Sequence, residues 1–386
     1  MRVLMTTWSW ATHFYPVVPI GWALRAAGHE VRVACPPGFA SVVAGSGLTP
    51  VPVGADVDAA DFMYRQPRAA DEGSPDEPVE DRRAPSRLRR AVATITACAE
   101  NIADDMVEFA RQWRPDLIIH EPMGYAGPIV AQVLGVPAVR VLWALDISEL
   151  TRPAEQELLA PLAARFGLDA VDTYSPVTID PNPVSLRTPS PGEHWPVRYV
   201  PHNGPGVVPD WLFEPPQRPR VCVTWGTSLA VIGGNSMFHA PVVVDVLADM
   251  DAEVVVAVED SHRQYFGNLP PNVRHVGRLP LDPLFAGCAA VVHQSGGGTM
   301  MNALVHGLPQ VLVPHVPDQV YYARRIEPTG AASHLLASRL DTETLRGQID
   351  RMLHEQKPRA AAESIRDEMR GFPTPSDLVD RLVALT

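Results

Sequence analysis

The sequence predicts an α/β protein built from two units, each a parallel sheet with helices on both faces. Short apolar runs typical of buried strands alternate with helical patterns, as they do in parallel sheets. The alternation begins at the N-terminus and restarts near residue 220. Residues 201–219 separate the two series and contain six prolines, too many for a helix or a central strand. A chain of 386 residues is also long enough for two domains.

Strand and helix patterns follow one another in the first unit. Residues 3–5 form the first apolar run, and a helical pattern over 17–27 follows, closed by Gly28 at a position where glycine often ends a helix. Further strand-like runs lie at residues 31–34, 117–119 and 138–142, and the apolar segment 123–134 is a candidate helix.

Residues 66–87 differ from their surroundings, since they carry four prolines and six acidic residues. This composition predicts a solvated loop. The alternative is a flexible cover over a substrate pocket.

The second unit repeats the strand and helix alternation, with strand-like runs at residues 220–224, 253–258, 289–293 and 311–313. The proline-rich segment before it is typical of a semi-rigid linker. We therefore predict a first domain over residues 1–205, a linker over 206–219, a second domain over 220–371, and a C-terminal helix over 372–386 that packs back on the first domain. A cleft between two such domains is the expected ligand site.

Charge and cysteine content narrow the class of protein. The net charge of −12 disfavours binding to nucleic acid. Four cysteines lie far apart without a C-x-x-C pair, which predicts buried thiols in a reducing compartment. The N-terminus does not resemble a signal peptide, and the uncharged stretch 122–139 contains too much proline and glycine for a membrane helix. We expect a cytoplasmic protein that binds neither nucleic acid nor membrane.

A glycine-rich turn near residue 293 is the most informative motif. An apolar run ends at His293, and the residues that come after it and open a helical pattern are Ser295, Gly296, Gly297, Gly298 and Thr299. Glycines allow close approach of a ligand, and a helix start offers free N–H groups and a positive dipole. The motif therefore predicts a diphosphate site, the alternative being a tight turn without a ligand.

Other motifs of this kind do not match the turn. His293 occupies the first glycine position of G-x-S-x-G, and no lysine follows the glycines as in a Walker loop. The G-x-G-x-x-G spacing is missing, and the turn after the first strand (residues 6–13) has no glycine, which disfavours a nicotinamide dehydrogenase.

The run HQSGGGT…GLPQVLVP…DQ, over residues 293–319, resembles the donor-binding signature of family 1 glycosyltransferases. Residues 9–31, SWATHFYPVVPIGWALRAAGHEV, resemble the opening of that family around its catalytic histidine. The subgroup is similar to actinobacterial enzymes that attach deoxysugars to antibiotics, including macrolides. The resemblance implies the GT-B architecture, in which two Rossmann-like domains face each other across a cleft. The first domain then binds the acceptor and the second the nucleotide sugar.

The resemblance assigns catalytic roles to two residues. His13 would be the general base, since the ordinary pKa of histidine suits proton transfer near neutrality. Glu121 stands where the family commonly has aspartate and would orient and stabilise the protonated ring. The donor site would comprise Gly226, Thr227, Ser228, Arg278, Leu279, His293, Ser295, Gly296, Gly297, Gly298, Thr299, Asp318 and Gln319. Arg278 departs from the family, which often has tryptophan there, but arginine can also stack on a base.

Candidate acceptor-binding residues are the aromatic side chains near the two catalytic positions and one carboxylate, namely Trp8, Trp10, Phe14, Trp143 and Asp146. Packing in the core is the alternative role for the aromatic ones. By resemblance the reaction is inverting transfer of a sugar, from a thymidine or other nucleoside diphosphate, to a hydroxyl of a polyketide-like aglycone. We expect no cofactor and no metal, because no cluster of carboxylates suggests a Mg²⁺ or Mn²⁺ site.

Other functions remain open from the sequence. A nucleotide-sugar 2-epimerase shares the GT-B fold but would need carboxylates around the sugar, and no convincing set is found. A non-catalytic protein that binds a nucleotide sugar is the alternative from another class. An auxiliary protein or a second copy of the chain is a possible partner.

Overall fold

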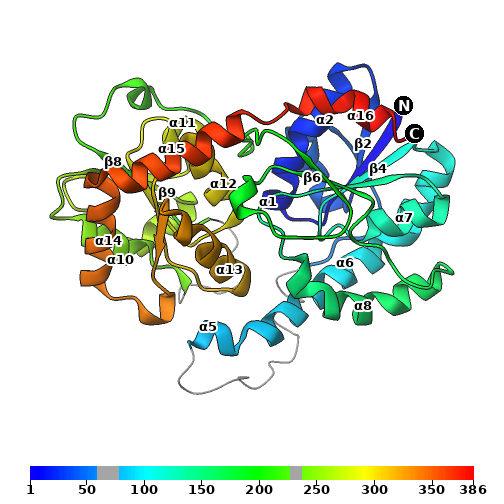
Figure 1. The fold of residues 1–386 in the computed structure, drawn as a ribbon, viewed down its shortest axis with the longest axis horizontal. Helices are drawn as coiled ribbons and strands as arrows, with labels where there is room; N and C mark the ends of the chain where they lie inside the picture. The colour runs from blue at the N-terminus through cyan, green and yellow to red at the C-terminus, as the bar shows by residue number, and fades with distance from the viewer. Residues whose placement is uncertain (59–77, 227–236) are drawn as a thin grey trace. The chain divides into compact units, whose positions relative to one another are not determined.

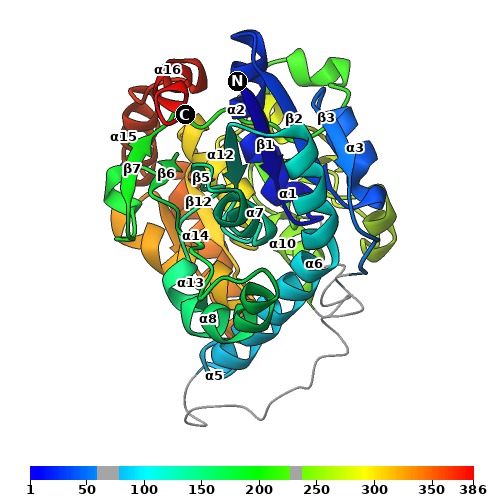
Figure 2. The ribbon, with the colours of Figure 1, turned by 90° about the vertical axis from the view of Figure 1, so that its right-hand side faces the viewer.

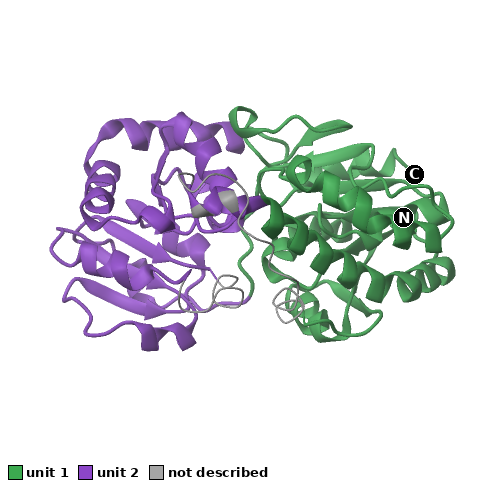
Figure 3. Cartoon of the chain, turned by 90° about the horizontal axis from the view of Figure 1, so that it is seen from below, with its two compact units in different colours: residues 1–69, 85–204, 371–386 green, residues 70–84, 205–370 purple. Residues whose placement is uncertain are grey.

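The computed structural model describes residues 1–58, 78–226 and 237–386. It divides into two compact units, coloured separately in Figure 3. Unit 1 comprises Met1–Ala69, Pro85–Gly204 and Gly371–Thr386, and unit 2 comprises Ala70–Ala84 and Pro205–Arg370.

Unit 1 contains a seven-stranded sheet in which every pair of neighbours is parallel. In spatial order the strands are β3 (Thr49–Pro52), β2 (Glu30–Cys35), β1 (Arg2–Thr6), β4 (Leu117–His120), β5 (Ala138–Val141), β6 (Val177–Asp180) and β7 (Glu193–Pro196). The strand order reverses direction between β1 and β4, where Thr6 lies opposite His120. Ligands of such sheets bind beyond the carboxyl ends of the strands at this point.

Alternate residues of β1 face opposite layers of unit 1. Val3 and Met5 belong to a core with α2 (Val18–Ala26), α3 (Ala40–Gly45) and α16 (Val379–Val383). Leu4 belongs to a second core with α6 (Ala84–Trp113), α7 (Ala126–Leu134) and α8 (Ser148–Arg165). Helices therefore cover both faces of the sheet, as the sequence predicts for buried parallel strands (Figures 1 and 2). The short helix α1 (Ala11–Phe14) comes shortly after β1.

Unit 2 contains a six-stranded parallel sheet of the same design. The strands in spatial order are β10 (Val273–Gly277), β9 (Glu253–Ala257), β8 (Arg220–Thr224), β11 (Ala290–His293), β12 (Gln310–Leu312) and β13 (Ala332–His334). The helices are α5 (Val79–Arg82), α10 (Ala240–Leu247), α11 (Leu281–Phe285), α12 (Gly297–His306), α13 (Pro317–Ile326), α14 (Thr342–His354) and α15 (Gln356–Arg370). The order reverses between β8 and β11, where Thr224 lies opposite His293.

Predicted segments and observed elements can be compared directly in unit 1. The helical pattern over 17–27 is α2, and Gly28 has the left-handed φ of +87° that the end of the helix requires. The apolar segment 123–134 contains α7. The predicted loop 66–87 is wrong for its last part, since α5 and the start of α6 lie there, and residues 59–77 are outside the described part.

The two units depart from the predicted domain boundaries. Residues 70–84 belong to unit 2. Two contacts hold this segment there. The carboxylate of Glu80 accepts hydrogen bonds from the backbone N–H and the hydroxyl of Ser338, and Asp81 forms a bidentate ion pair with Arg324. The predicted linker 206–219 is also part of unit 2, where Trp211 packs against a hydrophobic cluster. Residues 371–386 belong to unit 1, where Leu378 and Leu382 enter the core.

The described residues include no helix that is both long enough and apolar enough to cross a membrane. All four cysteines are free, and burial raises the pKa of the Cys35 thiol to about 12 and that of Cys98 to about 11.

Candidate active site

His13 and Glu121 meet at the reversal point of the unit 1 sheet. His13 lies in α1, shortly after β1, and Glu121 comes directly after β4. Because these strands are parallel neighbours, their carboxyl ends lie side by side and bring the two residues together. His13 Nδ1 is 3.3 Å from Glu121 Oε2, and the carboxylate is fully buried while His13 is 9% exposed. The sequence-predicted pair is thus in contact.

Two tryptophans surround this pair. The indole of Trp8 donates a hydrogen bond to His13 Nδ1 at 3.0 Å, and the indole of Trp143 donates to Glu121 Oε2 at 3.2 Å. The Trp143 ring also lies 4.0 Å from the His13 ring, centroid to centroid. Trp10 stacks on Trp8 at 5.0 Å. Trp8 and Trp143 therefore touch the predicted catalytic residues themselves, a relation that sequence spacing does not reveal.

His120, next to Glu121, is a supporting residue. One ring nitrogen contacts the hydroxyl of Ser175 at 2.8 Å, and the other contacts the backbone oxygen of Glu121. Burial lowers the pKa of His120 to about 4, so the ring is neutral at pH 7. Its two hydrogen bonds fix the backbone at the point where β4 ends and Glu121 begins.

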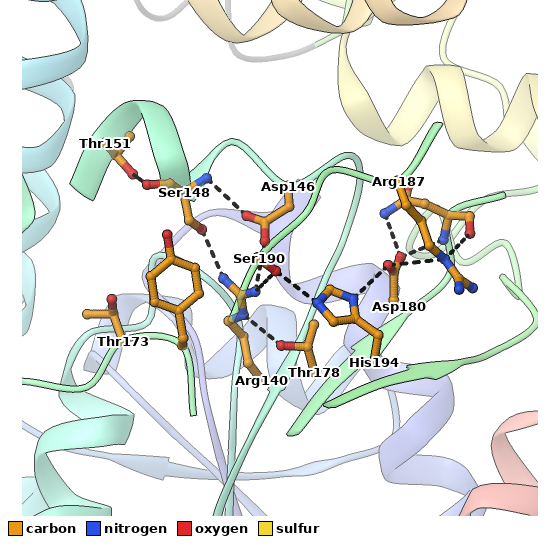
Figure 4. A network of polar contacts seen from close by, with 12 residues as sticks. Arg140, Asp146, Ser148, Thr151, Thr173, Thr178, Asp180, Arg187, Ser190 and His194 are labelled. Carbon is orange, nitrogen blue, oxygen red and sulfur yellow. Dashed lines mark hydrogen bonds and ion pairs between the residues drawn. The ribbon is translucent and has the colours of Figure 1, made fainter. Parts of the chain in front are cut away.

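Two predicted acceptor-binding residues have other roles. Phe14 is 1% exposed and packs edge-on against Phe39 in the core. Asp146 pairs with the buried Arg140 at 2.7 Å and accepts the backbone N–H of Ser148 (Figure 4). A buried guanidinium needs such a partner, because an unpaired charge in the interior is very costly. Both side chains are thus engaged inside the protein, and their contact with the acceptor stays a prediction.

The Arg140 network extends across neighbouring strands of the sheet. Arg140 also contacts the hydroxyls of Thr178, Ser148 and Ser190, and Ser190 contacts His194, whose other nitrogen meets Asp180 (Figure 4). These contacts tie down the loop after β5, which carries Trp143. The network thus supports the indole that reaches Glu121.

In unit 2, the glycine-rich turn joins β11 to α12. Ser295 has a φ of +66°, and Gly296 is the residue before the first turn of the helix. His293 is fully buried, and its Nδ1 accepts the N–H of Ser295 while its Nε2 meets Gln310 Oε1 at 2.9 Å. Burial lowers the pKa of His293 to about 4. Both ring nitrogens are used within the chain, so His293 supports the turn, and its direct contact with a diphosphate stays a prediction.

Backbone conformation and packing explain some of the glycines near this turn but not all of them. A Cβ at Gly226, whose φ is +62°, would lie 2.5 Å from the side-chain nitrogen of Gln294, and one at Gly296 would lie 2.9 Å from it. A Cβ at Gly298 would meet no atom within 4 Å. Neither backbone conformation nor packing requires glycine at 298. Alanine there would even stabilise the helix by up to about 1 kcal/mol, so the glycine needs another explanation. Space for a ligand beside the free N–H groups of the first turn of α12 is a sufficient reason.

The other predicted donor residues lie after carboxyl ends of strands in the same sheet. Arg278, with an exposed side chain, and the buried Leu279 come after β10. Asp318 and Gln319 open α13 after β12, and Gln319 Oε1 accepts the backbone N–H of His315 at 3.0 Å. Gly297 and Thr299 lie in the first turn of α12. Thr227 and Ser228 are outside the described residues.

The described residues contain no group of three or more histidine, cysteine, aspartate or glutamate side chains placed to hold a metal ion.

Two units with parallel sheets, each with its candidate residues beyond the carboxyl ends of the strands, define the GT-B fold of glycosyltransferases. The chain belongs to the family of the erythromycin biosynthesis protein CIII-like proteins, which are actinobacterial antibiotic glycosyltransferases. The model of the N-terminal domain of that family matches residues 22–226, and the model of the C-terminal domain matches residues 241–385.

Relatives and solved structures agree with this assignment. The chain is 36% identical over 417 residues to 10-deoxymethynolide desosaminyltransferase of Streptomyces venezuelae, covering 100% of this chain and 97% of the relative. It is 37% identical over 385 residues to L-demethylnoviosyl transferase of Streptomyces niveus, covering 100% and 98%. The crystal structure of the glycosyltransferase VinC in complex with dTDP is similar with a TM-score of 0.81 and 33% identity, covering 100% of this chain and 99% of that one.

Proposed function

We propose that the chain is an inverting, metal-independent glycosyltransferase. It moves a deoxysugar from a thymidine diphosphate sugar to a hydroxyl of a natural-product aglycone. The contact between His13 and Glu121 at the reversal point of the unit 1 sheet carries this proposal. The donor is supported by the dTDP bound in VinC, and the acceptor class by the relative that acts on 10-deoxymethynolide.

His13 acts as the general base through Nε2, because Nδ1 faces Trp8 and Glu121. The acceptor oxygen gives its proton to Nε2 while it forms a bond to the anomeric carbon of the sugar. The bond from that carbon to the diphosphate oxygen breaks, and the diphosphate leaves with the electron pair. Attack and departure occur on opposite faces of the sugar ring, which inverts the anomeric configuration. The fully buried carboxylate of Glu121 stabilises the imidazolium.

The first turn of α12 binds the diphosphate. Its free N–H groups and positive dipole stabilise the charge that develops on the leaving group. Gly298 leaves the space for close approach, and His293 holds the turn through its bonds to Ser295 and Gln310. No step in this scheme requires a metal.

The decisive experiment compares nucleotide binding with sugar transfer. Calorimetric titration with dTDP, UDP and NAD⁺, without added metal, should give tight binding of dTDP. His13→Ala should lower the transfer rate by about a thousandfold and leave dTDP affinity nearly unchanged, since proton transfer is lost and the donor site is intact. Transfer within a few-fold of the parent would show that His13 is not the base. Tight binding of NAD⁺ alone would refute the transferase proposal.

A further inference from the structure

More hydrogen-bond donors converge on Glu121 than one oxygen can accept. Its Oε2 lies 2.9 Å from the backbone nitrogen of Met123, 3.2 Å from the indole nitrogen of Trp143 and 3.3 Å from His13 Nδ1. A carboxylate oxygen has two lone pairs, so these donors compete. The contact with His13 is the longest of the three. Oε1, the other oxygen of Glu121, is buried and has no hydrogen-bond partner among the described residues.

His13 Nδ1 has a second partner, and the two exclude each other. The indole nitrogen of Trp8, 3.0 Å away, can only donate. If Nδ1 accepts this N–H, it carries no proton, and the proton of the neutral ring is on Nε2. If Nδ1 carries the proton and donates it to Glu121, Nε2 has the free lone pair but the Trp8 indole loses its acceptor. Only the second tautomer can act as a base through Nε2.

The geometry favours the first tautomer. The Trp8 contact is 0.3 Å shorter than the contact with Glu121, as the two distances of 3.0 and 3.3 Å show. The two lone pairs of Oε2 already accept hydrogen bonds from the Met123 backbone N–H and the Trp143 indole N–H. Trp8 is only 7% exposed and stacks on Trp10, so the indole lies in a largely buried place where its N–H needs an acceptor. An indole N–H buried without an acceptor is costly.

We propose that Trp8 is a positioning residue that holds resting His13 in the tautomer with the proton on Nε2. This inference rests on the proposed role of His13 as the base. In that state His13 offers a hydrogen bond to the acceptor oxygen but cannot take its proton. Conversion to the active tautomer leaves the charge of the ring unchanged. Nε2 gives one proton to water, and Nδ1 takes one proton from water and then faces Glu121 as a donor. Trp8 thereby sets the fraction of enzyme that is ready to act as a base.

Nitrogen NMR of the free protein, labelled with ¹⁵N in its histidine rings, tests this directly. The signals of His13 are identified by their loss in His13→Gln, and spectra are recorded at a pH of about 8, where an ordinary histidine is neutral. We expect an unprotonated signal for Nδ1 and a protonated one for Nε2 in the parent, and the reverse in Trp8→Phe. Trp10→Phe, the matched control, keeps an aromatic ring stacked on Trp8 and leaves the Trp8 indole N–H in place, so it should keep the parent pattern.

Kinetics supply a second readout. Trp8→Phe should raise the transfer rate by about two- to tenfold, because a larger fraction of the enzyme is in the active tautomer. A parent spectrum with the proton on Nδ1 would overturn the inference, as would an unchanged tautomer in a folded Trp8→Phe. The parent spectrum decides alone if that variant does not fold. Activity in His13→Ala would instead refute the base, which separates failure of the proposed function from failure of this inference.

Discussion

The reversal points of the two sheets have the same framework and different chemistry. In unit 1 the sheet reverses where Thr6 of β1 lies opposite His120 of β4, and in unit 2 where Thr224 of β8 lies opposite His293 of β11. Both histidines are buried, use both ring nitrogens inside the chain, and have a pKa lowered to about 4 by burial. The two reversal points differ in the residues that come after the histidine.

In unit 1 the next residue is Glu121, a carboxylate placed against His13. In unit 2 the chain enters a turn of glycines and begins α12 within four residues. In the proposed function, one reversal point therefore handles a proton and the other binds an anion. A histidine at the end of a central strand therefore supports the backbone in both units, whereas the side chains after it determine the chemistry. His13 lies outside this framework, and in the proposed mechanism its Nε2 faces the substrate.

Among these variants, we expect Glu121→Gln to have the largest effect, and this effect should be confined to the chemistry of unit 1. The amide keeps the shape of the side chain but loses the charge that stabilises the imidazolium, so kcat should fall by about a hundredfold. Affinity for dTDP should stay within about twofold of the parent by calorimetry, close to the error of such a comparison. A kcat near that of the parent would show that the carboxylate charge does not assist His13.

Gly298→Ala sharpens the comparison from the side of unit 2. A methyl group would occupy the space beside the first turn of α12, so affinity for dTDP should fall by about tenfold, or roughly 1.4 kcal/mol. The same change should raise the free energy of unfolding slightly, because alanine stabilises a helix by up to about 1 kcal/mol relative to glycine. Calorimetry and urea unfolding measure the two effects.

Gly347→Ala is the matched control for this pair of measurements. Gly347 lies in α14, and a Cβ there would also meet no atom within 4 Å. It should give the gain in stability without the loss of affinity. Equal affinities for the two variants would remove the argument that Gly298 borders the diphosphate.

The dependence of protein stability on pH tests the structural role of His120 and His293. The pKa of His120 and of His293 is about 4 in the folded protein, below the ordinary value of 6.5. Folding therefore favours the neutral rings, and this stability is fully present above pH 6.5. It is lost as the pH falls from about 6.5 to about 4, by an amount on the order of 3 kcal/mol for each residue.

Urea unfolding at a series of pH values measures this slope. His120→Gln and His293→Gln should each be less stable at neutral pH and show a shallower dependence on pH than the parent. A slope that neither change reduces would mean that other groups account for the acid sensitivity.

Much of this fold can be predicted from local patterns in the sequence. The apolar runs of β1 and β11, and the glycine that ends α2, specify their elements without help from distant residues. The meeting of His13 and Glu121 is predicted by the family resemblance alone, and the parallel pairing of β1 and β4 explains it, because the carboxyl ends of these strands lie side by side.

The internal partners of Phe14, Asp146 and His293 are not specified by any local motif. Phe14 next to a catalytic residue cannot be distinguished from a pocket residue until Phe39 is seen against it. Asp146 is neutralised by Arg140 from a preceding strand, and Gln310 satisfies His293 across β11 and β12. Such partners use up the hydrogen-bonding groups of Asp146 and His293. A sequence motif does not show which partners a side chain has in the folded protein.

Residues 70–84 and 371–386 have a practical consequence for recombination between relatives. Each belongs to the unit opposite to the one that its neighbours in the sequence suggest. A chimaera made by one crossover near residue 205 would separate Glu80 and Asp81 from their own partners Ser338 and Arg324. It would also give unit 1 a foreign C-terminal helix in its core. Exchange of a complete donor half with a relative therefore requires the transfer of two separate stretches of the gene, one of them very short.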